Sequence, residues 1–131
     1  MSKITEYLQA TGTFFLATVD GDQPRLRPLG AYAEVDGLTY FGVGDYKDVY
    51  KQLVANPKCE LVACKADGHW MRLTGVAKFD DDLKYAEAIF QFMPNLRDLY
   101  SPESGHIMKT FYIDPVAAVD IPVMGPGESL V

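Results

Sequence analysis

The sequence predicts a mainly β (α+β) fold, an antiparallel barrel with its helices on the outside. Three observations support this prediction: seven runs of residues are typical of strands, short turns join most of them, and helical segments are inserted between them. The chain has 131 residues, a length that suits one domain, 1–131, with room for a hydrophobic core.

Three strand-like runs in the first third of the chain organise the fold. They cover residues 13–19, 24–32 and 38–43, and an Asp-Gly pair occupies each turn between them. Asp-Gly between apolar runs favours a hairpin, because glycine adopts a positive φ without a Cβ clash. A helix over residues 3–10 is expected before these runs, with Ser2 as its N-cap.

The middle of the chain is expected to hold one helix and two long strands. The helix covers residues 46–55, and Asp45 is expected to cap it. The strands cover residues 58–65 and 69–79, and Gly75 indicates a bend or bulge in the second of them.

The last third is expected to contain a helix, an irregular stretch and two strands. The helix begins in the acidic run 80–82 and ends near residue 92. Strands over 107–113 and 116–123 are expected to be separated by Asp-Pro, and the tail 122–131 to be loosely ordered. The buried stripe of the helix is expected to be Leu83, Ala86, Phe90 and Met93.

Charge and hydropathy exclude several classes of partner. Twelve basic and 18 acidic residues give a net charge of −6, which argues against nucleic acid or an anionic membrane surface as the main partner. No apolar run approaches the roughly 20 residues of a transmembrane helix, and the N-terminus lacks the apolar stretch of a signal peptide.

The two cysteines favour a reducing compartment. Cys59 and Cys64 share one expected strand, and their odd separation places them on opposite faces, which makes a disulfide between them unfavourable. A cytoplasmic location follows as the expectation. No metal site is expected, because zinc usually needs four ligands and the nearby His69 is isolated.

Two pairs of cations suggest an anion site. Arg25 and Arg27 lie on one face of the second strand, and Lys47 and Lys51 lie one turn apart on the helix that follows the third. Free N–H groups at a helix start favour phosphate, and lysine adds charge. The alternatives are a solvated edge strand, which would also explain Pro24 and Pro28, and a solvent-facing amphipathic helix.

Other residue types have both a functional and a structural interpretation. Trp70 and Arg72 share a face of one strand, where they could stack on a flat ring and pair with an anion, or form an interface. His69 and His106 lack a serine or cysteine partner in any catalytic motif. The segment 100–105 could be a lid over a pocket or a simple connector.

Several motifs, in their order and spacing, resemble a known family over roughly residues 5–123. They are Gly12 to Thr18, Gly21 to Gly30, Lys47 to Leu53 followed by Asn56-Pro57, and Trp70 to Gly75. This pattern resembles the pyridoxamine 5′-phosphate oxidase-like superfamily of FMN-binding split β-barrels. The most similar branch is the small single-domain one related to nitroimidazole-resistance proteins.

The resemblance implies an antiparallel split β-barrel of about six strands and a homodimer with FMN at the subunit interface. The carboxyl-terminal segment of this chain differs from that of true pyridoxamine phosphate oxidases, because no arginine follows Arg97. We therefore expect the fold and the cofactor but not that substrate. The candidate cofactor contacts are Arg25, Arg27, Pro28, Leu29, Gly30, Phe41, Gly42, Val43, Lys47, Lys51, Trp70 and Arg72.

The function expected from the resemblance is that of an FMN-dependent oxidoreductase that reduces a small acceptor by two electrons, with a nicotinamide donor. FMN supplies this chemistry, so no catalytic side chain is expected. The alternatives are a non-catalytic module that holds FMN, or haem through His69 or His106, and a purely structural dimer.

Overall fold

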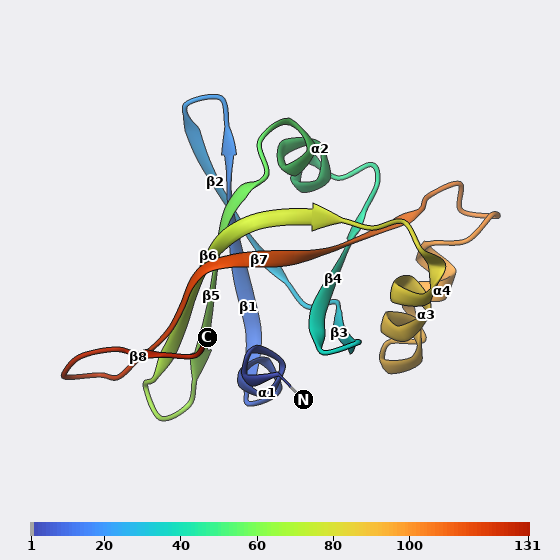
Figure 1. The fold of residues 1–131 in the computed structure, drawn as a ribbon. Coiled ribbons are helices and arrows are strands. Elements are labelled where there is room, and N and C mark those ends of the chain that lie inside the picture. Colours follow the sequence, from blue (N-terminus) through green and yellow to red (C-terminus); the bar gives the residue numbers. More distant parts are fainter. Residues whose placement is uncertain (1) are drawn as a thin grey trace.

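One antiparallel sheet, curled into a half-barrel, forms the body of the molecule (Figure 1). The computed structural model describes residues 2–131. The strands are β1 (Thr11–Asp20), β2 (Gln23–Leu29), β3 (Tyr32–Val35), β4 (Leu38–Gly44), β5 (Lys58–Lys65), β6 (Trp70–Phe79), β7 (Met108–Ile121) and β8 (Glu128–Ser129). Their order is β2-β1-β5-β6-β7-β4-β3, with β8 paired to β7. This architecture confirms the predicted mainly β split barrel.

The inner face of the sheet carries the core. Leu16, Leu61, Leu73 and Ala118 lie directly opposite one another across β1, β5, β6 and β7, and each is at most 1% exposed. Residues opposite each other on antiparallel strands share a face, so this row crosses the middle of the barrel. Arg27 continues the row on β2, next to Leu16.

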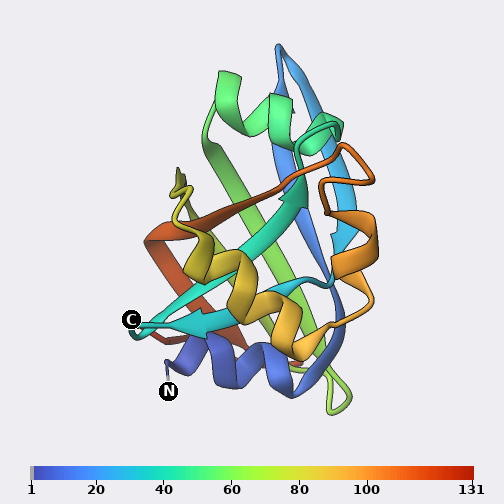
Figure 2. The same cartoon turned by 90° about the vertical axis from the view of Figure 1, so that its right-hand side faces the viewer.

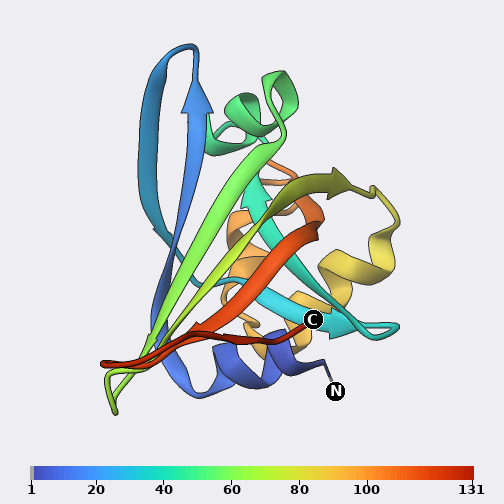
Figure 3. The same ribbon diagram turned by 60° about the vertical axis from the view of Figure 1, so that its left-hand side comes forward.

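Within residues 2–131, four helices cover the ends and one side of the sheet: α1 (Lys3–Gln9), α2 (Asp48–Ala55), α3 (Leu83–Phe92) and α4 (Leu96–Leu99). α1 and α2 lie at opposite ends of the barrel (Figure 3). α3 packs on β3 and β4 (Figure 2), where Tyr85 stacks on Tyr40 with 3.8 Å between ring centroids. The Ser2 hydroxyl accepts from the Thr5 amide at 3.1 Å, which confirms the predicted cap of α1.

The prediction of one strand over residues 24–32 is wrong at its carboxyl-terminal end. β2 stops at Leu29, and β3 begins at Tyr32 on the far edge of the sheet. Gly30 and Ala31 connect the two edges, a change of strand that the local sequence pattern of residues 24–32 does not reveal.

The two expected terminal strands are also wrong, because β7 runs unbroken through Pro115. The register between β6 and β7 shifts between Thr74 and Gly75, as the predicted irregularity requires, but the extra residue is Val116 on β7 rather than a residue of β6. A Cβ at Gly75 would lie 2.2 Å from the Asp114 carbonyl oxygen, so this close approach of the two backbones requires glycine. The tail is not loose, since β8 pairs with β7 and the Leu130 amide donates to the Ala118 oxygen at 2.8 Å.

Two helix details differ from expectation. Asp45 does not cap α2: the helix starts at Asp48, and the Asp45 Oδ1 accepts from the Ile107 amide at 3.1 Å. On α3 the buried side chains are Tyr85 and Ile89, whereas Leu83 is 80% exposed. The expected stripe is therefore only partly right, because Ala86 and Phe90 pack against the buried cluster that includes Ile89, whereas Leu83 lies outside it.

Both cysteines are free, and they lie on opposite faces of β5 as predicted, with Cys59 buried and Cys64 exposed. Burial raises the pKa of the Cys59 thiol to about 11. Within residues 2–131, His, Cys, Asp and Glu side chains do not gather in groups of three or more suited to a metal ion. In the same range, no helix is both long and apolar enough to cross a membrane.

Candidate functional site

A cleft of about 1130 Å³ lies between the β1–β2 hairpin and α2. Figure 1 shows these two elements at the same end of the barrel. Five of the predicted site residues line the cleft together: Arg25, Arg27, Pro28, Lys47 and Lys51. The cations that suggested an anion site in the sequence therefore line a single hollow in the structure.

The cleft concentrates positive charge in an acidic chain. Its lining includes four cationic side chains and two carboxylates, Asp20 and Asp48, although the net charge of the protein is −6. Arg25 Nε donates to Asp20 Oδ2 at 3.1 Å, so one of the cations is partly neutralised. Among the ion pairs of residues 2–131, none involves Arg27, Lys47 or Lys51.

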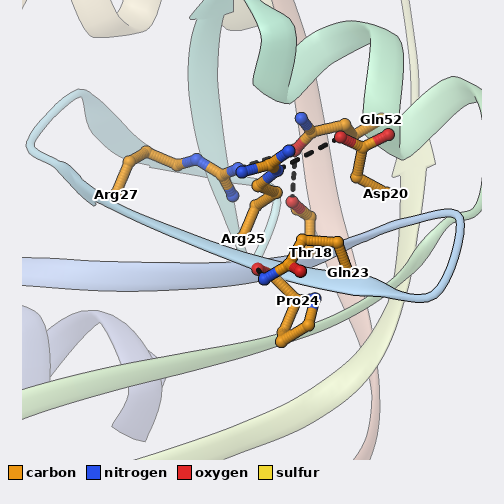
Figure 4. Close-up of polar contacts among 7 residues, drawn as sticks. All are labelled: Thr18, Asp20, Gln23, Pro24, Arg25, Arg27 and Gln52. Atoms are coloured by element: carbon orange, nitrogen blue, oxygen red, sulfur yellow. Dashed lines mark hydrogen bonds and ion pairs between the residues drawn. The ribbon is translucent and has the colours of Figure 1, made fainter.

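Arg27 is the most firmly positioned of these cations (Figure 4). It lies opposite buried Leu16, so its side chain starts from the inner face. Its guanidinium donates to the Leu16 carbonyl oxygen at 3.0 Å and to Gln52 Oε1 at 2.7 Å. Both partners are neutral, and a partly buried cation with neutral partners favours an incoming anion.

Electrostatics at Arg27 agree with this geometry. Burial lowers the pKa of its guanidinium from the ordinary value, and the neighbouring charge of Arg25 lowers it further, while Asp48 acts in the opposite direction. Two arginines on one strand repel each other, so an anion between them would relieve that repulsion.

The N-terminus of α2 adds main-chain donors to the cleft. Lys47 occupies the N-cap position and no side chain caps the helix, so its first-turn N–H groups lack a capping acceptor. Such groups, at the positive end of the helix dipole, bind phosphate and other anions. The Lys47 ammonium lies 5.5 Å from the centroid of the Tyr46 ring, at the edge of this region.

The sequence analysis missed Gln52 and Thr18. Gln52 Oε1 accepts from the Thr18 hydroxyl at 2.6 Å as well as from Arg27, and so it fixes α2 to the hairpin. Gln52 follows Lys51 directly and is one turn from Asp48, the spacing that indicates a shared helix face. Which face of α2 meets the hairpin depends on packing that no local pattern reveals.

Five further predicted contacts lie outside the lining of this cleft. Leu29 is the last residue of β2, and Gly30 follows it. The other three, Phe41, Gly42 and Val43, lie on β4, and the side chains of Phe41 and Val43 are buried. The Gly42 amide donates to the Ala31 carbonyl oxygen at 3.0 Å. From Gly42 to the end of β4, the strand pairs with β7 but with no other described strand. The end of β4 leads through Asp45 to the cleft residue Lys47.

Trp70 and Arg72 lie away from the cleft. Arg72 belongs to a row of opposite residues that crosses the sheet through Val62 and Phe15 to Pro28. This row is on the outer face of the sheet, whereas Arg27 is on the inner face. Three strand spacings, about 14 Å, separate β6 from β2. The Arg72 guanidinium is 4.9 Å from the centroid of the Trp70 ring, and its Nε is 3.7 Å from Glu60 Oε2.

The split barrel and the cation-lined cleft at an uncapped helix start are the features that the comparisons with known proteins can be set beside. The chain belongs to the pyridoxamine 5′-phosphate oxidase family, whose model matches residues 1–108. No curated protein sequence matches the chain.

Solved structures agree with the family assignment. A NimC/NimA family protein from Clostridium acetobutylicum has a TM-score of 0.87 and 34% identity, covering 97% of this chain and 88% of that one. A heme binding protein from Mycobacterium smegmatis has a TM-score of 0.74 and 15% identity, covering 98% of this chain and 58% of that one. An FAD-binding protein from Mesorhizobium loti has a TM-score of 0.63 and 19% identity, covering 92% and 96%. The last two show a shared fold.

Proposed function

We propose that the protein binds FMN, with the phosphate in the cleft between the hairpin and α2, and uses it to reduce a small acceptor. One observation carries the proposal: Arg27, Lys47 and Lys51 line one cleft without a carboxylate partner, beside the uncapped start of α2. A phosphate dianion would complete the hydrogen bonds of these groups. A structural neighbour named as FAD-binding supports a flavin in this fold.

The residues fit the rest of the cofactor as well. The predicted contacts Leu29 and Gly30 lie at and directly after the end of β2, and Phe41, Gly42 and Val43 lie on β4, which leads into the cleft. Their main chain would border the ring, and Pro28 lines the cleft next to them. When bound, FMN supplies two-electron transfer from a nicotinamide donor to a quinone or nitroaromatic acceptor.

The chain's own residues would orient the cofactor and adjust its charge. Arg25 and Arg27 would hold the phosphate, and Gln52 would keep the Arg27 guanidinium aligned through its 2.7 Å hydrogen bond. The Arg72 guanidinium, brought to the ring by a second copy of the chain, would favour negative charge there. No side-chain nucleophile is needed for this reaction.

We also propose a homodimer that covers the outer face of the sheet. Leu26 and Val116 are 69% and 77% exposed, and half-exposed Phe15 shares a row with Pro28, Val62 and Arg72. Exposed apolar side chains on a continuous sheet face indicate an interaction surface. A second copy on this face would bring its Trp70 and Arg72 to the cofactor. Sedimentation velocity of Leu26→Asp should then show a monomer, and an unchanged dimer would contradict this arrangement.

The test is a flavin titration followed by turnover. FMN absorbance near about 450 nm should shift on binding, and NADH with menadione should then be consumed catalytically. Lys78→Met is the matched control for cleft variants, because it removes an exposed positive charge on β6 outside the cleft. A protein that fails to bind FMN would contradict the proposal, and binding without turnover would reduce it to a flavin-binding module.

A second candidate is haem binding without turnover, favoured by the structural neighbour named as a heme binding protein. The candidate ligands are His69, whose Nδ1 is 3.1 Å from Asp120 Oδ1, and His106, whose ring centroid is 4.1 Å from that of Tyr46. A Soret shift on hemin titration that is lost in His106→Ala or His69→Ala would support this candidate. An unchanged Soret band would contradict it.

A further inference from the structure

A second hollow lies on the other side of the segment that leads into α2. It has a volume of about 410 Å³ and is bounded by α3 on one side and by the loop after α4 on the other. Figure 2 shows α3 beside α4 and this loop. Its walls include Leu83, Ala86 and Phe90 of α3, and Tyr100, His106 and Met108 of the facing segment.

No lysine, arginine, aspartate or glutamate is among the residues that line this pocket. The polar residues of the lining are Tyr100, Ser101 and His106, and burial raises the pKa of Tyr100, so its phenol stays neutral. Placing an ionised ligand in such a site would remove it from water without a counter-charge. The occupant that fits is uncharged.

The loop wall is preformed by main-chain hydrogen bonds. The Asp45 amide donates to the Ile107 oxygen at 2.9 Å, and the Ile107 amide donates to Asp45 Oδ1 at 3.1 Å. Within the loop, the Ser101 amide donates to Ser104 Oγ at 3.1 Å and the Ser104 amide to Ser101 Oγ at 3.2 Å. A pocket that exists before binding saves the ligand the cost of ordering a loop.

The floor of the pocket is equally fixed. Met108 is buried there, and a Cβ at Gly42 would lie 2.5 Å from its sulfur and 3.1 Å from Ile89 Cδ1. The aromatic and thioether side chains around the space favour a flat ring, because ring edges and sulfur pack well against ring faces.

We propose that this pocket binds an uncharged aromatic compound of one or two rings that carries a hydroxyl group. Pockets of 300–1,000 Å³ are the usual size for small ligands, so about 410 Å³ accommodates two fused rings. A hydroxyl suits the polar residues present, because it can donate to or accept from the His106 imidazole in either tautomer. This inference does not depend on a flavin in the cleft.

The test uses 2-naphthol as the probe and methyl-labelled methionine NMR as the readout, on the protein as purified. Met108 lines this pocket, whereas Met93 lines a separate hollow near α1 and Met124 is exposed in the tail. We expect saturable ring-current shifts at Met108 that exceed those at Met93 and Met124. Shifts that are largest at Met93, or that do not saturate, would overturn the proposal.

Three variants and one charged probe complete the experiment. Ala86→Phe fills the pocket, and Leu83→Asp puts a charge at an exposed rim where the fold does not depend on leucine, so each should weaken 2-naphthol binding at least tenfold. Val54→Asp makes the same type of change at an exposed position of α2 outside the pocket and should leave 2-naphthol affinity unchanged. Anionic 2-naphthoate should bind at least tenfold more weakly than 2-naphthol. The proposal would be overturned if Ala86→Phe bound 2-naphthol as tightly as the wild-type protein does. It would also be overturned if the wild-type protein bound 2-naphthol and 2-naphthoate equally tightly.

Discussion

The two hollows of this molecule have opposite chemistry although one short segment separates them. Lys47 lines the cleft, and its neighbour Tyr46 packs against His106, which lines the pocket. The cleft is built from an edge strand and a helix start, two elements whose main-chain groups are incompletely paired. The pocket is built from the side of α3 and a self-bonded loop, which offer mainly side-chain carbon.

This difference shows that the kind of element bordering a hollow determines what it can bind. In the cleft, the uncapped amides at the start of α2 and the arginines Arg25 and Arg27 of β2 supply positive charge that is not fully buried. The α3 face, in contrast, is apolar, and its residues Leu83, Ala86 and Phe90 are exposed or only partly buried, so part of it remains available to a ligand.

The largest expected effect that tests the comparison comes from Arg27→Met. Removing a charge-assisted contact costs about 1.5–3 kcal/mol, so FMN affinity should fall roughly 10- to 100-fold. Riboflavin lacks the phosphate, and its affinity should change less than about threefold. Fluorescence titration with both flavins measures this, with Lys78→Met as the control. A parallel loss of both affinities would place Arg27 at the ring instead.

Gly42→Ala tests the floor of the apolar pocket. The new Cβ would lie 2.5 Å from the Met108 sulfur and 3.1 Å from Ile89, so the core must shift at a cost of about 1–3 kcal/mol. Urea denaturation measures this loss of stability. Gly12→Ala is the matched control on a strand, because a Cβ there has no neighbour within 4 Å. Equal stability of the two variants would contradict the described packing.

Asp120, which lies away from both hollows, provides a pH test. The Tyr7 hydroxyl donates to it at 2.7 Å and His69 lies at 3.1 Å, and these contacts lower the pKa of its carboxyl group. A lowered native pKa stabilises the fold above the ordinary carboxyl range, and the stabilisation is lost as pH falls through the native pKa. Asp120→Asn should therefore cost about 1 kcal/mol at pH 7 and less at acid pH.

Denaturation of both proteins at neutral and acid pH measures this difference. Ligand affinity at the cleft and the pocket should stay unchanged in Asp120→Asn, since Asp120 lines neither. A constant stability difference across the acid range would contradict the assigned contacts.

The smallest effect is the response to salt. Raising ionic strength from about 0.05 to 0.5 M shortens the Debye length and should weaken FMN binding several-fold. Binding of uncharged 2-naphthol should change by less than about twofold under the same conditions. Equal salt dependence of the two ligands would remove the contrast between the hollows.

The sequence revealed the cleft much better than the pocket. Arg25 and Arg27 could be placed on one face because side chains alternate along a strand, and Lys47 and Lys51 because helical neighbours are four apart. The docking of Gln52 against Arg27 could not be predicted, since it depends on how α2 sits on the hairpin. Likewise, Pro115 suggests a strand break until its pairing with Gly75 is known.

The pocket was hidden because its residues look like core. Leu83, Ala86 and Phe90 recur at helical spacing, and an apolar stripe does not distinguish burial in the barrel from the wall of a hollow. Tyr85 and Ile89 occupy the buried positions instead, through contacts with β3 and β4 that arise only in the folded chain.

The affinity ratio of FMN to riboflavin for the wild-type protein tests the central claim most directly. If the cleft holds the phosphate through Arg27, the lysines and the start of α2, several charge-assisted contacts distinguish the two flavins. FMN should then bind at least about 100-fold more tightly than riboflavin at low salt. Equal affinity for the two flavins would contradict the account.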